Sequence, residues 1–268
     1  MRYICFYTLF KTSFRSLQLI IAFSSVKGGV SKTTSCCNLA YFLAKKEKKI
    51  LVMDFDSQGG ATHHLSSKFS KKFKASITDV LTDKCKIDHA IHSYAKNLDL
   101  IPISFSFHEI ASTNFKDILV SSLKTVMENY DYLLFDLAPS IYPGSIIPLG
   151  LSDYTVIPVD SSGGLSLLGL RSEEKILEQV TQNNKSQVKI LGILPCFVER
   201  TKISADVIKF LNENYKEFVL PSVRCSTQIA QASSLGKSIF EYRPTSNGAK
   251  DYSAVGDEIL KRLERKGF

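Results

Sequence analysis

The sequence predicts a single α/β domain in which helices cover both faces of a mainly parallel β-sheet. From Leu19 onward, short apolar runs alternate with amphipathic stretches, the order typical of parallel strands joined by helices. Several of these runs are almost continuously apolar, as expected of strands that are buried on both faces. The 268 residues, of which 44% are hydrophobic, suffice for one domain with a sizeable core.

Strands are expected where short apolar runs end in polar or turn-forming residues, and helices where apolar residues recur every three or four positions. The expected strands are residues 19–25, 50–54, 98–101, 132–136, 154–158, 189–194 and 218–220. The expected helices are residues 32–45, 115–129, 165–182, 204–214 and 252–265. The basic segment 66–74 is expected to form a surface loop. Residues 19–268 therefore make up the predicted domain.

Residues 1–18 are expected to form a poorly ordered N-terminal extension, or to result from a start codon placed too far upstream. Their aromatic residues and leucine recur at intervals typical of one helix face, so the alternative is a basic amphipathic helix that touches a membrane or a partner. No small-residue cleavage site follows, and the chain has no run of 18 apolar residues. Neither a signal peptide nor a membrane span is expected.

The charge balance favours a polyanionic partner. Lys and Arg outnumber Asp and Glu by 34 to 26, a net charge of +8, which suits nucleic acid or an anionic membrane. The six cysteines include no C-x-x-C pair, so they indicate neither a zinc site nor a cluster scaffold. We expect reduced thiols in a cytoplasmic protein.

The first predicted strand runs into a glycine-rich segment, VKGGVSKTT, which leads directly into the first predicted helix. In this position, the backbone N–H groups of the turn and the positive end of the helix bind phosphate groups. Lys32 is expected to contact the β- and γ-phosphates of a nucleotide, and the Thr33 hydroxyl to bind Mg²⁺.

This segment does not fit the usual motif G-x-x-x-x-G-K-[ST], because Val26 and Ser31 occupy its glycine positions. It fits K-G-G-x-x-K-[ST] instead, which moves the glycines and adds Lys27 at the start of the loop. The sequence therefore predicts a phosphate loop with two lysines rather than one.

Three aspartates are expected near the phosphates. Asp54 and Asp56 end the second strand in the segment ILVMDFDSQGG, where carboxylates suit the positioning of a metal and of water. Asp136 ends the hydrophobic strand in NYDYLLFDLAPS, the general form of a Walker B strand, and is expected to accept a hydrogen bond from a magnesium-bound water.

The segment VKGGVSKTT resembles the deviant Walker A loop of the ParA/MinD family, and the resemblance continues from about residue 19 to 263. It implies that Lys27 reaches the phosphates of the partner subunit in a nucleotide-sandwich dimer, and that the small Ser31 is tolerated in place of a glycine. It implies that Asp56 orients the attacking water and that Asp54 supports the metal shell. The ATP-binding residues it implies are Lys27, Gly28, Gly29, Val30, Ser31, Lys32, Thr33 and Thr34, and the metal residues are Thr33, Asp54 and Asp136.

The carboxyl half is similar to the same family in KILGILPCFVERTKIS and in the stretch from VLPSVRCS to GAKDY. By position in these motifs, Arg200 and Arg224 are implied to contact DNA phosphates, and Pro195 and Pro221 to lie where the family holds adenine. Guanidinium groups contact phosphates without reading base sequence, which suits non-specific DNA binding. The adjacent His63 and His64 are interpreted as solvated loop residues, because no carboxylate or cysteine clusters with them.

The resemblance implies an ATP- and Mg²⁺-dependent ATPase, catalytic through Lys27, Lys32 and Asp56. Such a protein forms a homodimer on ATP, binds DNA non-specifically and partitions a plasmid or chromosome with a ParB-like stimulating protein. A cytoplasmic, nucleoid-associated location follows, and membrane attachment is not expected. Family members carry D-T-P-P-S and D-x-D-P-Q, where this chain has D-L-A-P-S and D-F-D-S-Q, which puts the rate in doubt.

Two alternatives from other classes stay open. The first is a MinD-like membrane-cycling ATPase, for which the tail DEILKRLERKGF offers Leu260 and Leu263 beside several cations. The second is a weakly hydrolysing regulatory protein that only binds nucleotide, supported by the altered D-L-A-P-S segment. A liposome and DNA sedimentation assay separates the first from ParA, and phosphate release separates the second.

Overall fold

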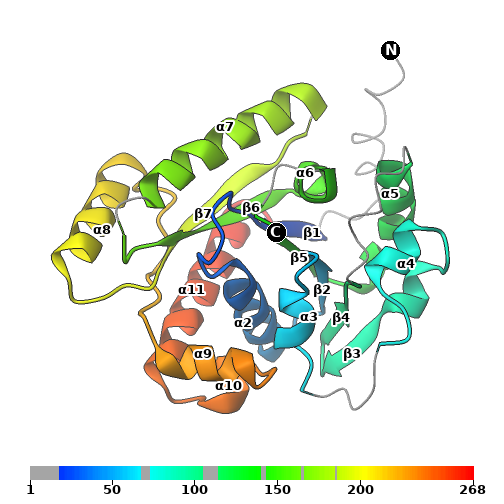
Figure 1. Cartoon of the computed structure of the whole chain (residues 1–268), viewed down its shortest axis with the longest axis horizontal. Coiled ribbons are helices and arrows are strands. Elements are labelled where there is room, and N and C mark those ends of the chain that lie inside the picture. Colours follow the sequence, from blue (N-terminus) through cyan, green and yellow to red (C-terminus); the bar gives the residue numbers. More distant parts are fainter. Residues whose placement is uncertain (1–17, 68–72, 105–113, 140–142, 164–165, 185) are drawn as a thin grey trace.

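A seven-stranded sheet in the order β3-β4-β2-β5-β1-β6-β7 forms the centre of the molecule (Figure 1). The structure, a computed structural model, describes residues 18–67, 73–104, 114–139, 143–163, 166–184 and 186–268. All described strand pairs are parallel except β3 with β4, which is antiparallel. The prediction of a single α/β domain with a mainly parallel sheet is confirmed.

The strands are β1 (Leu19–Phe23), β2 (Ile50–Phe55), β3 (His92–Ala95), β4 (Leu98–Ile101), β5 (Tyr132–Leu137), β6 (Tyr154–Asp160) and β7 (Lys189–Cys196). The longer helices are α2 (Lys32–Lys45), α5 (Phe115–Val126), α6 (Pro143–Leu151), α7 (Ser166–Asn184), α8 (Lys202–Asn214), α9 (Thr227–Ser234) and α11 (Asn247–Glu264). The shorter ones are α3 (Gly60–His64), α4 (Ile77–Leu81), α10 (Ile239–Tyr242) and the 3-10 turns η1 (Ile87–Ala90) and η3 (Met127–Asn129).

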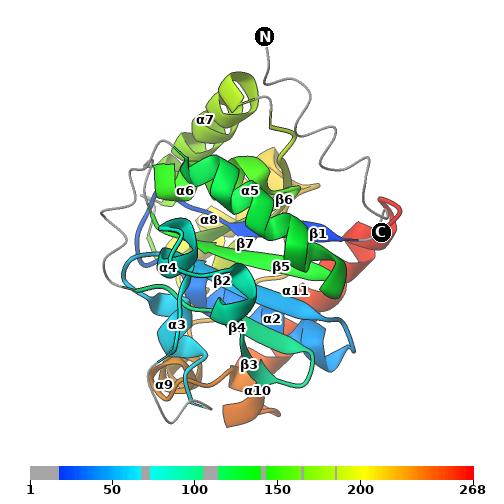
Figure 2. The ribbon, with the colours of Figure 1, turned by 90° about the vertical axis from the view of Figure 1, so that its right-hand side faces the viewer.

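Helices cover both faces of the sheet, as Figure 2 shows from the side of β3 and β4. Alternate residues of β1 point to opposite faces, so Leu19, Ile21 and Phe23 pack with α2 and α11, whereas Ile20 and Ala22 pack on the side of α5, α6 and α7. Each face thus has its own apolar core, and every residue of β1 is buried. This two-sided burial is the reason why the strands are almost continuously apolar in sequence.

The central position of β1 places the functional site. Its neighbours are β5 on one side and β6 on the other, although both follow it by more than a hundred residues. The chain moves from β1 to β2 in one direction along the sheet and later returns to add β6 and β7 on the opposite side. In open α/β sheets, a ligand binds at the carboxyl ends of strands where the order reverses in this way.

Six of the predicted strands are present, with ends shifted by up to two residues. The predicted strand 218–220 is reduced to a single parallel bridge between Val219 and Ile193, and the segment forms a second isolated bridge further on, between Arg224 and Val198. The antiparallel edge strand β3 has no counterpart among the predictions. Residues 1–17 lie outside the described residues, as do 68–72 of the predicted basic loop, so the N-terminal extension stays a prediction.

The interpretation of both histidines as solvated is wrong for His64. The His64 side chain is buried in α3, and its Nδ1 atom lies 3.0 Å from the Ser233 hydroxyl of α9. Its neighbour His63 is exposed. Packing of α9 against α3 covers one histidine and leaves the other in solvent, which adjacent positions on a short helix allow.

Candidate functional site

The phosphate loop joins β1 to α2 at the carboxyl edge of the sheet. Two of its residues have left-handed backbone conformations, Gly29 at φ 73° and Ser31 at φ 76°. Glycine adopts this conformation freely, whereas a residue with a side chain adopts it at a cost of about 1 kcal/mol. Ser31 thus has a backbone conformation that glycine adopts more easily, and it forms the N-cap of α2.

Lys32 begins α2 and folds back over the loop. Its side chain is buried, and its Nζ donates to the Lys27 carbonyl oxygen at 3.1 Å. Burial lowers the pKa of Lys32, while the charges of Asp136, Asp56 and Glu173 act to raise it. Of the other loop residues, Val30 is buried, Gly28 and Gly29 are exposed, and the Thr34 carbonyl accepts from the Asn38 side chain.

Thr33 and Asp136 lie in direct contact. The Thr33 hydroxyl donates to Asp136 Oδ2 at 2.7 Å, and the other oxygen, Oδ1, is buried with no hydrogen-bond partner among the described residues. Burial raises the pKa of Asp136 well above its usual range, and the charge of Asp54, its partner in the β2–β5 register, raises it further. A divalent cation at this point would satisfy the free oxygen and relieve the repulsion, so the donor set fits Mg²⁺.

Asp54 and Asp56 differ in their surroundings. Asp54 is fully buried, and its oxygens accept from the backbone N–H and hydroxyl of Thr62 at 2.8 and 2.7 Å and from the Asp56 N–H at 3.0 Å. Burial raises the pKa of Asp54 to about 6 in spite of these hydrogen bonds. Asp56 is partly exposed, and within the described part of the chain its carboxylate accepts one hydrogen bond, from the Gln58 N–H at 3.0 Å. Asp54 is thus engaged in holding the loop, and Asp56 has capacity to bind a water.

The loop after β2 approaches Thr33 closely at Gly60. A Cβ atom added to Gly60 would lie 3.0 Å from both Thr33 Cγ2 and Thr33 Oγ1. This distance is shorter than a normal van der Waals contact, so a side chain at position 60 would require the Thr33 side chain to shift.

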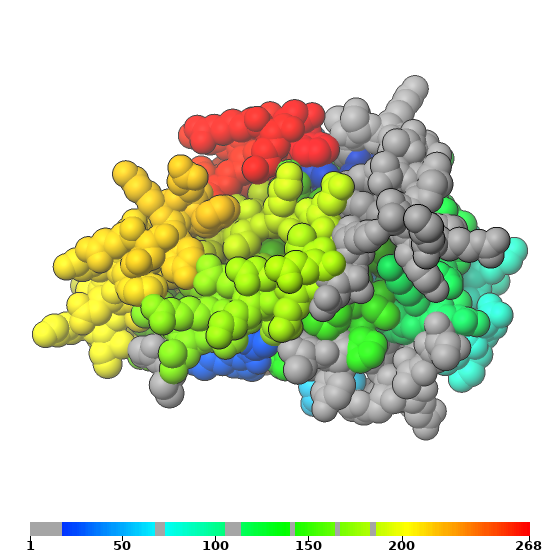
Figure 3. All heavy atoms as spheres, turned by 90° about the horizontal axis from the view of Figure 1, so that it is seen from above, coloured from blue at the N-terminus to red at the C-terminus, as the bar shows by residue number. Residues whose placement is uncertain are grey.

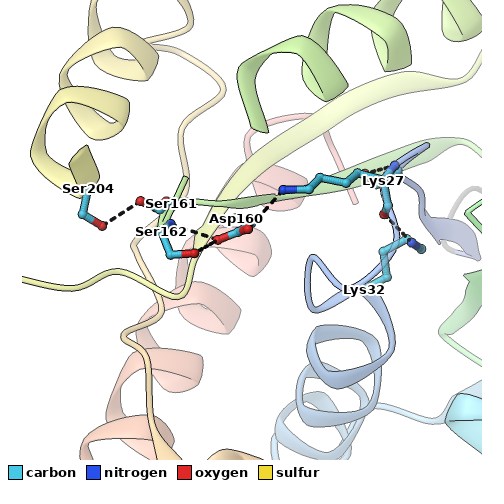
Figure 4. A network of polar contacts seen from close by, with 7 residues as sticks. Lys27, Lys32, Asp160, Ser161, Ser162 and Ser204 are labelled. Atoms are coloured by element: carbon cyan, nitrogen blue, oxygen red, sulfur yellow. Dashed lines mark hydrogen bonds and ion pairs between the residues drawn. The ribbon is translucent and has the colours of Figure 1, made fainter. Parts of the chain in front are cut away.

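Lys27 points away from Lys32 and pairs with a residue of its own chain. Its Nζ lies 3.1 Å from Asp160 Oδ2, at the end of β6 (Figure 4). Burial by itself would raise the pKa of Asp160, but hydrogen bonds from Ser162 and the charge of Lys27 hold it below its usual range. The next residue, Ser161, accepts through its carbonyl oxygen from the Ser204 hydroxyl of α8 at 2.9 Å.

The remaining predicted residues lie further along the same edge of the sheet. Pro195 is buried within β7, and Pro221 is partly exposed in the segment beside it. Arg200 is exposed between β7 and α8. Arg224 is exposed too, and its guanidinium forms a two-pronged ion pair with Asp251 of α11, with distances of 3.0 Å from Nε and 2.7 Å from Nη2. The structure brings the loop residues, Asp54, Asp56 and Asp136 together, and it leaves both arginines outside this group.

Sequence reasoning missed three carboxylates near these residues, namely Asp160, Glu173 and Asp251. Asp160 ends a strand, as Asp54 and Asp136 nearly do, so the same rule would have selected it. Glu173 lies on the apolar side of α7 between Leu170 and Leu177, and an acidic residue at such a position is a signal for a buried carboxylate. Nothing in the sequence around Asp251 marks it.

Comparisons with known proteins find relatives along most of the chain. A family model described as an AAA domain matches residues 18–190. The cell division protein PomZ of Myxococcus xanthus is 31% identical over 251 residues, which cover 90% of this chain and 77% of PomZ. The sporulation initiation inhibitor protein Soj of Bacillus subtilis is 31% identical over 248 residues, which cover 90% of this chain and 97% of Soj.

Solved structures share the fold. The ATP complex of Cyanothece McdA superposes with a TM-score of 0.79 at 24% identity, covering 93% of this chain and 98% of that one. A plasmid partition protein from Borrelia burgdorferi superposes with a TM-score of 0.73 at 25% identity, covering 93% and 99%.

Proposed function

This chain belongs to the ParA/Soj family of partitioning ATPases, and we propose that it uses ATP and Mg²⁺ to form a dimer that binds DNA without sequence preference. The observation that carries the proposal is the contact of Thr33 with Asp136 beside the two-lysine loop. It brings a hydroxyl ligand from the start of α2 together with a buried carboxylate of β5 that has a free oxygen, next to the buried Lys32.

In the proposed hydrolysis, different residues bind the phosphates, hold the metal ion and orient the attacking water. The loop backbone and Lys32 bind the phosphates of ATP, and Thr33 and Asp136 would hold Mg²⁺, which neutralises phosphate charge when it is bound. Asp56 orients the water that attacks the γ-phosphate, while Asp54 holds the loop that carries Asp56. In a dimer, Lys27 leaves Asp160 and contacts the nucleotide of the second subunit. The protein thus supplies position and charge rather than covalent chemistry.

DNA is the proposed ligand of this dimer. Arg200 is exposed between β7 and α8, and Arg224 is exposed beside Asp251 of α11. Figure 3 shows the face of the molecule on which α7 and α8 lie next to each other. A ParB-like protein would stimulate hydrolysis and so release the DNA. A cytoplasmic protein associated with the nucleoid fits this cycle, with a plasmid or a chromosome as cargo.

The MinD-like alternative receives less support. Of the two tail leucines, Leu263 is fully buried and Leu260 is partly buried against the same core, so the tail offers little apolar surface to a membrane. Throughout the part of the chain that the structure describes, no helix combines the length and the apolar composition that a membrane crossing needs.

The test measures the molar mass of the protein by light scattering after size exclusion, with ATP or ADP and Mg²⁺, followed by sedimentation with DNA or with anionic liposomes. We expect the protein to be a dimer with ATP and a monomer with ADP. We expect the dimer to sediment with DNA and not with anionic liposomes. Lys32→Ala should remain a monomer with ATP, because it removes the main fixed cation of the phosphate site. Lys45→Ala, at the exposed end of the same helix, is the matched control. ATP-dependent dimerisation of Lys32→Ala at the wild-type protein concentration would refute the phosphate-loop assignment.

A further inference from the structure

A buried carboxylate of α7 contacts the backbone where β1 leads into the phosphate loop. Glu173 of α7 is 2% exposed, and its Oε2 accepts the Val26 N–H at 2.8 Å. The Ser24 hydroxyl, which also contacts Thr155 of β6 at 2.8 Å, hydrogen-bonds Glu173 as well. These contacts join α7 to the first residues after β1, across 147 positions of sequence between Val26 and Glu173.

Packing alone does not account for an acidic residue at this position. Glu173 shares the buried side of α7 with Leu170 and Leu177, where an apolar side chain would fill the space without a desolvation penalty. Burial raises the pKa of Glu173, which measures how unfavourable its charged form is there. The hydrogen bond to the loop backbone is the gain that offsets this penalty.

A second contact of α7 is with Lys27, the residue that follows Val26. Gly169, one turn before Glu173, faces Lys27, and a Cβ atom added to it would lie 3.6 Å from Lys27 Cβ. The helix therefore meets the start of the loop at two successive residues, Val26 and Lys27. In addition, the charge of Glu173 acts to keep Lys32 protonated against its burial.

We propose that Glu173 is a positioning residue for nucleotide binding, which holds the Val26 peptide so that the loop keeps the conformation that receives phosphates. This proposal rests on the proposed ATP-binding function. Glu173 contacts the loop backbone, so it acts on ATP affinity through the loop and not on the hydrolytic step itself.

Three variants separate this role from general effects. Glu173→Leu removes the acceptor and leaves the Val26 N–H unpaired, whereas Glu173→Gln removes the charge but keeps an amide oxygen that can accept. Glu178→Gln removes the same charge from the exposed side of the same helix. Titration with a fluorescent ATP analogue measures Kd for each variant. Steady-state kinetics give kcat and KM for ATP, and thermal unfolding without nucleotide gives Tm.

Glu173→Leu should raise Kd and KM for ATP about tenfold, as expected for one unpaired buried N–H group, with kcat at saturating ATP within about twofold of wild type. Glu173→Gln and Glu178→Gln should stay within about threefold of the wild-type Kd. If Glu173→Leu unfolds, Glu173→Ala replaces it, with the same expected rise in Kd.

Wild-type affinity in a folded Glu173→Leu protein would overturn the proposal, and a lower Tm at unchanged Kd would assign Glu173 to stability alone. Failure of both the Leu and the Ala variant to fold would overturn it too, by making Glu173 a folding requirement. If the wild-type protein itself does not bind the analogue, the proposed function fails. If wild type and variant bind it equally, only the role of Glu173 fails.

Discussion

At the scale of single residues, two aspartates in one short segment have different hydrogen bonds, and this difference is the basis of the different roles that we propose for them. Asp54 is buried and already accepts three hydrogen bonds, from Thr62 and from the Asp56 N–H. Asp56, two positions later, is partly exposed and accepts one, from Gln58. A partly exposed carboxylate that accepts one hydrogen bond has more capacity to bind and orient a water than a buried one that accepts three.

Asp56→Ala should therefore retain ATP binding and lose hydrolysis. Removal of a water-positioning group affects the chemical step and leaves the phosphate-binding loop intact, so kcat should fall by roughly two orders of magnitude at an unchanged Kd for ATP. The variant should accumulate as an ATP-bound dimer on DNA, measured by sedimentation alongside phosphate release. Turnover at the wild-type rate would transfer the role to another carboxylate, with Asp54 as the first candidate.

At the scale of elements, the end of β6 holds the start of the phosphate loop. The Lys27–Asp160 ion pair connects the β1–α2 loop to β6, and the hydrogen bond from Ser204 connects the following residue to α8 (Figure 4). A lysine that reaches a second subunit must first break this pair. The pair is partly exposed, because the Lys27 side chain is 37% and the Asp160 side chain 19% accessible to solvent. Breaking it therefore costs little free energy, about 0.5 kcal/mol.

Asp160→Asn should therefore favour the ATP-bound dimer. The change keeps acceptor capacity for Ser162 but removes the charge that retains Lys27, in each of two subunits, so the dimer dissociation constant should fall about fivefold. Sedimentation velocity over a range of protein concentrations with ATP measures this. Asp206→Asn, on an exposed position of α8, controls for the loss of one negative charge. A weaker dimer would mean that Asp160 still supports Lys27 after association.

At the scale of the whole molecule, the net charge of +8 does not by itself select a DNA-binding face. Arg200 is exposed, whereas the charge of Arg224 is partly offset by Asp251, which also accepts the Arg224 N–H. The ion pair fixes the orientation of the guanidinium while reducing its net charge. In DNA binding, Arg200 should thus neutralise about one phosphate, and Arg224 should neutralise less than one.

Replacement of Arg200 and Arg224 together by Ala should abolish most DNA binding while ATP-dependent dimerisation continues. A symmetric dimer presents each arginine twice, so the slope of log affinity against log salt should become shallower by roughly two to four units. The loss should be similar for unrelated DNA sequences, because phosphate contacts carry no base information. The control replaces Lys84 and Lys116, which are exposed on the opposite side of the molecule around α4 and α5. Coincident salt curves for the two double variants would show that diffuse charge, rather than these arginines, binds DNA.

The sequence by itself determined the parts of this protein that depend on neighbouring residues. Six strands, the bounds of α2, the phosphate loop and the carboxylates Asp54, Asp56 and Asp136 all follow from apolar runs, glycine spacing and strand ends within short segments. The family resemblance extended these assignments to the carboxyl half. The left-handed conformation of Ser31 is local too, and the motif positions it where a glycine is usual.

Only the tertiary structure decided which distant residues meet. Glu173 reaches Val26, Asp160 reaches Lys27 and Asp251 reaches Arg224 because parallel strands and their helices bring separate segments to one edge of the sheet. The packing of α3 against α9, the pairing of the edge strand β3 with β4 and the burial of His64 also depend on elements that meet only in the fold. A local pattern contains the preference of a segment for helix or strand, but the partner of a buried polar group is set by the fold, since its free energy depends on atoms contributed from elsewhere.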